Sequence, residues 1–344
     1  MKRIIIIASS LLLCLQAFAQ EKDSPKFGIN QTGFVSVPKV GGYIIGGYKY
    51  SDLDGANGGP GFNCRLIRLY VDGSIFNDFK YRIQFQANGG PHIKDFYIEW
   101  ARWKGFSVKV GQFKRAFTFE NPMNPWDVGV GDFSLLVQKF AGMGDRLGEA
   151  NMGGRDLGVQ IQGDLFPIGS SQHRLVHYQL GVFNGQGINQ ADANQAKDII
   201  GTIQFQPIKG LYLGVFGWMG NWNNGTVDLK RERICAGLKF DRNNWSVRAE
   251  YATALAGEVE QSGAADAFYV TVGVPVLDWL KIYAKWDEYR AQGNPGSSHD
   301  LISACVNFRL HKNLNFQVEY RYHNNKLLPK PQYNEIWLMG YIRF

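Results

Sequence analysis

Short runs of alternating apolar and polar residues repeat along most of this chain, and Gly, Asn and Asp separate them. A period of two predicts half-buried β-strands, because successive side chains of a strand point to opposite faces. Over 79–89, for example, Ile83 and Phe85 lie on one face, whereas Arg82 and Gln84 lie on the other. The pattern therefore predicts an all-β fold.

Sixteen segments show this alternation, at 40–52, 62–76, 79–89, 92–103, 106–117, 154–166, 173–185, 197–207, 210–222, 230–241, 244–257, 264–276, 279–290, 300–310, 314–324 and 333–344. An even number of antiparallel strands is typical of a closed bacterial transmembrane β-barrel, with the apolar face toward lipid and the polar face toward a wet lumen. A soluble β-sandwich is the alternative, because it also has one apolar face per strand.

The N-terminus has the features of an export signal. Lys2 and Arg3 precede the apolar run 4–15, and Ala17 and Ala19 provide small residues before a cleavage site. The run is too short for a stable transmembrane helix, which needs about 20 residues. We expect cleavage after Ala19.

The expected organisation is a signal peptide at 1–19, an N-terminal segment at 20–39 and a β-barrel pore domain at 40–344. Cys14 offers a lipoprotein alternative, but Leu13 before it is too bulky for a good lipidation signal. Export and the sixteen consecutive strands favour the barrel over the sandwich. The mature chain has no other long apolar segment that could form a transmembrane helix.

The formal net charge is +7, and loss of Lys2 and Arg3 leaves an excess of +5 that permits a preference for anions. The remaining cysteines, Cys64, Cys235 and Cys305, are far apart and lack metal-ligand spacing. We expect no metal, no other cofactor and no nucleic-acid partner.

Alternation also predicts which charged side chains point into the lumen. The inward basic residues are Lys80, Arg82, Lys109, Arg115, Arg231, Arg233, Lys239, Arg248, Lys281, Lys285, Arg309 and Arg321. The inward acidic residues are fewer: Asp95, Glu99, Asp156, Asp164, Glu250, Asp287 and Glu319. A basic lumen would concentrate anions, although these side chains could equally form ion pairs that stiffen the wall.

The longest connection, 118–153, is expected to be a third extracellular loop that folds into the lumen and narrows it, with a short helix near 134–140. A disordered surface loop is the alternative. Its charged residues include Glu120, Asp127, Asp132, Lys139 and Arg146.

Two parts of the sequence carry a family resemblance. The segment Lys109–Phe117 with Gly154–Gln160, and the strand Tyr178–Gly187, resemble the porin O and P family of phosphate-selective porins and their relatives. The C-terminal Phe344 is similar to the terminal aromatic residue that the insertion machinery of outer-membrane barrels reads. The resemblance implies a barrel in the outer membrane of a Gram-negative bacterium, commonly a homotrimer in lipid, conducting small hydrophilic solutes passively.

The sequence predicts a pore without identifying its solute. Phosphate-selective relatives use lysines from the fifth loop, and residues 221–229 contain none. An acidic third loop that faces a basic wall instead predicts an electric field across the lumen. We expect such a pore to have a mild preference for anions. An outer-membrane hydrolase or a non-conducting structural or adhesin barrel is the alternative, although no catalytic motif is evident and His173 and His177 lie about 13 Å apart along a strand.

Overall fold

The computed structural model describes residues 36–53, 60–89, 92–149 and 153–344. The expected signal peptide, its cleavage after Ala19 and most of the segment 20–39 lie outside these residues, so those expectations stay predictions.

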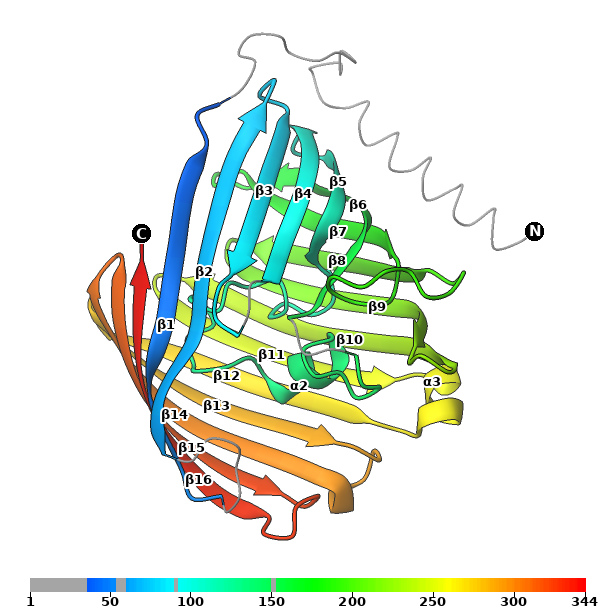
Figure 1. The fold of residues 1–344 in the computed structure, drawn as a ribbon. Helices are drawn as coiled ribbons and strands as arrows, with labels where there is room; N and C mark the ends of the chain where they lie inside the picture. The colour runs from blue at the N-terminus through cyan, green and yellow to red at the C-terminus, as the bar shows by residue number, and fades with distance from the viewer. Residues whose placement is uncertain (1–35, 54–59, 90–91, 150–152) are drawn as a thin grey trace.

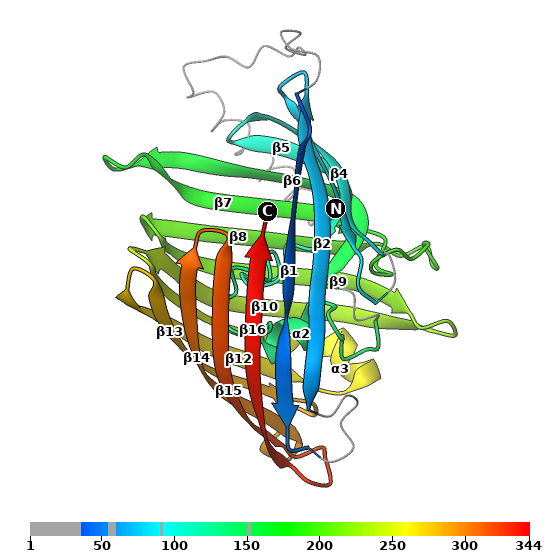
Figure 2. The ribbon, with the colours of Figure 1, turned by 60° about the vertical axis from the view of Figure 1, so that its left-hand side comes forward.

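The described residues form sixteen antiparallel strands in one closed barrel, in which each strand pairs with its neighbours in sequence (Figures 1 and 2). The strands are β1 (Lys39–Ser51), β2 (Gly61–Ile75), β3 (Phe79–Gln86), β4 (His92–Trp103), β5 (Phe106–Lys114), β6 (Arg155–Ile168), β7 (His173–Phe183), β8 (Asp198–Ile208), β9 (Leu211–Asn223), β10 (Asp228–Arg242), β11 (Trp245–Ala254), β12 (Asp266–Leu277), β13 (Leu280–Arg290), β14 (Ser298–His311), β15 (Leu314–Asn325) and β16 (Gln332–Arg343). The sixteen-stranded barrel predicted from alternation is confirmed.

The barrel closes between its first and last strands. β1 pairs with β16 from Tyr43 opposite Arg343 to Ser51 opposite Glu335. Beyond that ladder, the N–H of Phe344 donates to the Gly42 carbonyl at 3.0 Å, and the Gly42 N–H donates back at 2.9 Å. Closure leaves no strand edge unpaired, which a β-structure in lipid requires.

The two faces of the wall differ as the alternation predicts. On β13, Trp286 is 49% exposed on the outer face, whereas its neighbour Asp287 is fully buried on the inner face. Ile83 and Phe85 of β3 are likewise exposed, with Gln84 buried between them. The apolar face is therefore the outer one, which excludes a sandwich with its apolar face inward.

Two β-bulges interrupt this alternation. In β2, Ile45 pairs with Leu66 and Gly46 pairs with Cys64, so Arg65 is an extra residue. In β4, the ladder with β3 skips Lys94 in the same way. A bulge makes two consecutive side chains point to one side, and here both bulges turn a cation toward the interior.

Residues 115–149, which follow β5, lie inside the barrel (Figure 1). We call these residues the inward loop. It contains α2 (Leu135–Phe140), whose N-cap Ser134 accepts the Val137 N–H at 3.2 Å, as expected for the predicted helix near 134–140. The apolar side chains of α2 join Trp218 and other wall residues in the main buried cluster.

A second helix, α3 (Ala256–Ser262), connects β11 to β12. The prediction that a strand extends to residue 257 is therefore wrong at its end, since β11 stops at Ala254. None of the helices in the described ranges is long and apolar enough to cross a membrane.

Candidate solute passage

Wall carboxylates hold the backbone of the inward loop. Three of them accept a loop N–H: Glu250 from Phe119 at 2.6 Å, Asp287 from Leu135 at 2.7 Å and Glu319 from Gly131 at 2.5 Å. They stand on β11, β13 and β15, so the loop is attached across that side of the wall. Charge-assisted hydrogen bonds of this kind are roughly twice as strong as neutral ones.

Buried ion pairs lie within the inward loop, within the wall, and between the loop and strands β10 and β11. The predicted lumen residues Arg115, Arg231, Arg233, Arg248 and Lys285 are all nearly inaccessible to solvent. Their closest carboxylates are respectively Glu149 at 2.8 Å, Glu149 at 2.7 Å, Asp145 at 2.6 Å, Glu120 at 3.6 Å and Asp287 at 3.0 Å. These five cations point inward, as predicted, but they neutralise carboxylates of the loop and wall, which corrects the expectation that they line the channel and contact anions.

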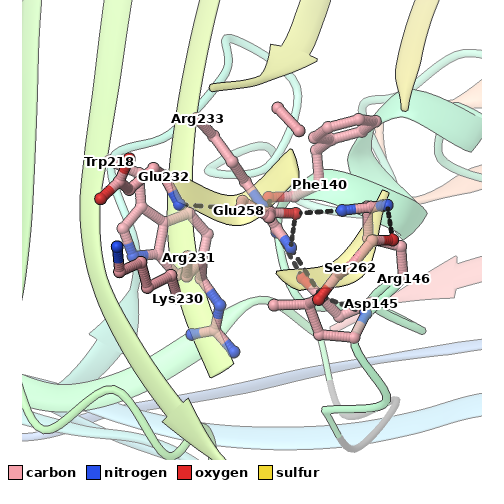
Figure 3. A network of polar contacts seen from close by, with 12 residues as sticks. Phe140, Asp145, Arg146, Trp218, Lys230, Arg231, Glu232, Arg233, Glu258 and Ser262 are labelled. Carbon is pink, nitrogen blue, oxygen red and sulfur yellow. Dashed lines mark hydrogen bonds and ion pairs between the residues drawn. The ribbon is translucent and has the colours of Figure 1, made fainter. Parts of the chain in front are cut away.

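Figure 3 shows the network around Arg233. Its guanidinium makes five hydrogen bonds, two to Asp145, two to Glu258 and one to the Phe140 carbonyl. An arginine has five N–H donors, so this side chain is fully satisfied. Arg146 of the inward loop reaches the same Glu258 at 2.5 Å.

Part of the space that the inward loop leaves open lies along β2 to β7. Two cavities occupy it, and Lys114 lines both of them. The first is also bounded by Gln86 and Arg155, and the second by Arg82 and Gln160, which lie further along the same strands β3 and β6. The two cavities thus follow one another along the barrel wall. We call them together the passage.

The lining of the passage is strongly basic. Its seven cationic side chains are Arg65, Arg68, Arg82, Lys94, Lys109, Lys114 and Arg155, and its acidic side chains are Asp95 and Asp132. Of the predicted cations, Arg82 and Lys109 belong to it. The other five cations are not among the residues predicted from the sequence.

Lys114 lies where the wall contacts the inward loop and lines both cavities. Its ammonium donates to the carbonyls of Asn121 at 2.6 Å and Met123 at 2.5 Å, and it lies 4.9 Å from the centre of the Phe133 ring. Because these partners are neutral, its positive charge is not cancelled by them. Arg68 is similar, since it donates to Tyr43 at 2.8 Å and to Gln86 at 3.2 Å.

Other cations of the passage have carboxylate partners. Arg155 makes two hydrogen bonds to Asp95, and Arg65 binds Asp132 of the inward loop at 2.6 Å. Burial alone would raise the pKa of Asp132, but the Arg65 guanidinium holds that pKa below the ordinary aspartate value. The Asp132 carboxylate therefore stays charged.

The remaining predicted residues lie elsewhere. Lys239 lines a third cavity, which Asp164 and His177 also line. Lys281 and Arg309 line a fourth cavity together with Trp126. Lys80 is exposed at the start of β3, Arg321 stacks on Trp337, and Lys139 lies over Tyr289. Asp127 of the loop lies 3.7 Å from Arg343.

No cluster of three or more His, Cys, Asp or Glu side chains in the described segments could hold a metal ion. His177 binds Asp164 at 2.7 Å, and His173 accepts or donates a hydrogen bond with Ser171 at 2.7 Å.

A closed sixteen-stranded barrel, apolar outside and narrowed by an internal loop, defines the protein as a channel-type barrel of the outer membrane. Residues 7–327 match the family of Gram-negative porins, and the chain belongs to that family. It is therefore an outer-membrane porin. A comparison with curated proteins gives no match.

Solved structures share this fold at low sequence identity. The anion-selective porin from Comamonas acidovorans aligns with a TM-score of 0.70 and 13% identity, over 90% of this chain and 100% of that one. OmpF of Salmonella typhi, in complex with daunomycin, gives 0.64 and 13%, over 89% and 97%. The channel DcaP of Acinetobacter baumannii gives 0.62 and 12%, over 92% and 99%.

Proposed function

We propose that this porin lets small hydrophilic solutes diffuse passively through the passage and prefers anions. The observation that carries the proposal is the lining, in which seven basic side chains face two acidic ones. A fixed positive potential in a narrow, low-dielectric channel raises the local concentration of anions. The anion selectivity named for the porin from Comamonas acidovorans is consistent with this assignment.

The inward loop serves as the constriction in this proposal. Pro122 and Phe133 of the loop complete the walls of the passage opposite β2 to β6. On the other side, wall carboxylates and buried arginines hold the loop against the barrel. The solute path is therefore one-sided, and the residues of β2 to β6 set its charge.

The test is a reversal potential across planar bilayers with a gradient of KCl. We expect a potential that corresponds to greater permeability for chloride than for potassium. A potential of the opposite sign would refute the anion preference, and the absence of any conductance from correctly folded barrels would refute the porin function and favour a structural or adhesin barrel.

Two finer proposals follow from the sequence. The first is membership of the porin O and P family; membership does not by itself imply phosphate selectivity, and block of the chloride current by inorganic phosphate would support the phosphate-selective branch. We also propose a homotrimer, a form recorded for OmpT of Vibrio cholerae, which shares the fold with a TM-score of 0.61. Light scattering of the detergent-solubilised protein measures the number of copies.

A further inference from the structure

The outer end of the inward loop is attached to a second loop, the one that contains α3. Glu258 of α3 is fully buried and receives hydrogen bonds from two arginines on different elements. Arg233 of β10 approaches it at 2.9 Å, and Arg146 of the inward loop approaches it at 2.5 Å (Figure 3). One carboxylate therefore joins barrel wall, inward loop and α3.

Arg146 adds contacts to the end of the helix. Its second terminal nitrogen donates to the carbonyls of Ser262 at 2.9 Å and Gly263 at 2.8 Å. These carbonyls close the C-terminus of α3, where helix carbonyls lack intrahelical donors. The inward loop thus contacts α3 at its first turn through Glu258 and at its last turn through two backbone groups.

The helix itself is attached to the wall. The Glu232 carboxylate of β10 accepts the Gly257 N–H at 3.0 Å, and the Glu232 carbonyl accepts the Leu255 N–H at 2.8 Å. The Glu232 N–H donates in turn to Glu258 at 3.0 Å. Because α3 is fixed to β10 in this way, it is a firm anchor for the inward loop.

We propose that Glu258 is a positioning residue for permeation. It clamps the inward loop to the α3 loop, and it thereby fixes the width of the passage, which lies on the opposite side of the inward loop. Its action on solutes is indirect, since it lines neither cavity of the passage. The consequence for conductance rests on the proposed function, whereas the clamp itself is a property of the fold.

The test replaces Glu258 by Gln, which removes the charge but keeps the size of the side chain. Glu260→Gln is the matched control, because Glu260 lies in the same helix with an exposed side chain. Hydrogen exchange of the amides of 135–146, measured on folded barrels in detergent, reports the clamp without requiring conduction. We expect exchange at least about tenfold faster in E258Q and unchanged in E260Q, since opening a local structure exposes its amides.

Single-channel recording then tests the consequence. We expect E258Q to show larger current fluctuations at an unchanged reversal potential, because the charged lining is intact while the loop moves. Wild-type exchange rates in E258Q would overturn the proposal. If E258Q fails to assemble, Arg146→Gln removes the contact from the loop side and the same readout decides. A silent wild-type channel with fast exchange in E258Q would refute the porin function and leave the clamp standing.

Discussion

Lys114 is the residue whose charge we expect to matter most for selectivity, because it lines both cavities of the passage. Its ammonium donates to two neutral carbonyls of the inward loop and makes no hydrogen bond to a carboxylate of the described residues. Lys114→Gln removes this charge. Lys114→Arg keeps the charge and the capacity to donate to the Asn121 and Met123 carbonyls.

The size of the effect follows from Coulomb's law. At a separation of about 4 Å, two unit charges interact by about 1 kcal/mol in water and about 4 kcal/mol near a protein surface. For a water-filled passage we take the lower value, which corresponds to a change of about fivefold for chloride and an opposite change of about fivefold for potassium, and so of about 25-fold in the ratio of their permeabilities. At about 0.1 M salt the screening length is about 10 Å, so an ion beside Lys114 still experiences most of this attraction.

The assay is the reversal potential in asymmetric KCl for the wild type, K114Q and K114R. Lys230→Gln is the control for a lost positive charge, because Lys230 is exposed on β10 outside the passage. We expect reduced chloride preference in K114Q and wild-type values in K114R and K230Q. Equal reversal potentials for all four folded proteins would refute the placement of the solute path at Lys114.

Two further predictions concern the barrel and its clamp. Gly47→Ala should impair closure, because an added Cβ would lie 1.9 Å from the Leu338 carbonyl oxygen across the β1–β16 seam. Gly217→Ala is the control, since a Cβ at Gly217 has open space. We expect the folded barrel to lose about 2 kcal/mol or more of stability in G47A alone, which heat-modifiable gel migration would show. The contact between Asp145 and Arg233 should withstand acid. Burial would raise the pKa of Asp145, but the Arg233 guanidinium holds that pKa well below its usual range. A depressed carboxyl pKa adds stability above the unfolded-state value, and that stability is lost only as the pH falls through the folded-state pKa. The Leu147 N–H, which donates to Asp145 at 3.0 Å, should therefore have equal hydrogen-exchange protection factors at about pH 7 and about pH 4.5, and unequal factors would contradict this assignment.

The strands could be predicted from the sequence because their signal is local. Period-two alternation and Gly, Asn or Asp at the turns mark the sixteen strands, and the same signal assigns Trp286 outward and Asp287 inward, as observed. Helix α3 could not be predicted in this way. It has seven residues, and its N-cap Leu255 makes no side-chain cap hydrogen bond, so its stability comes from Glu258 and the wall.

The site was harder to predict because it depends on where the inward loop lies. Arg231 and Arg233 do point inward, as alternation requires, yet the loop covers them and supplies their carboxylates. Arg82 points inward as well and stays beside the passage. Nothing within a single strand distinguishes these two situations, since the difference arises from contacts more than 80 residues apart in sequence.

Four of the cations that the sequence analysis did not identify share a physical cause. Alternation assigns Arg65, Lys94, Lys114 and Arg155 to the outer face, but the first two lie at bulges and the others at the ends of β5 and β6. A Lys or Arg facing lipid costs up to about 2–4 kcal/mol at the bilayer midplane. A cation at an outward position of a barrel strand is therefore itself evidence that the strand bulges or ends there. Applied to this chain, that rule directs both bulge cations into the passage, where they add to the positive charge on which anion selectivity depends.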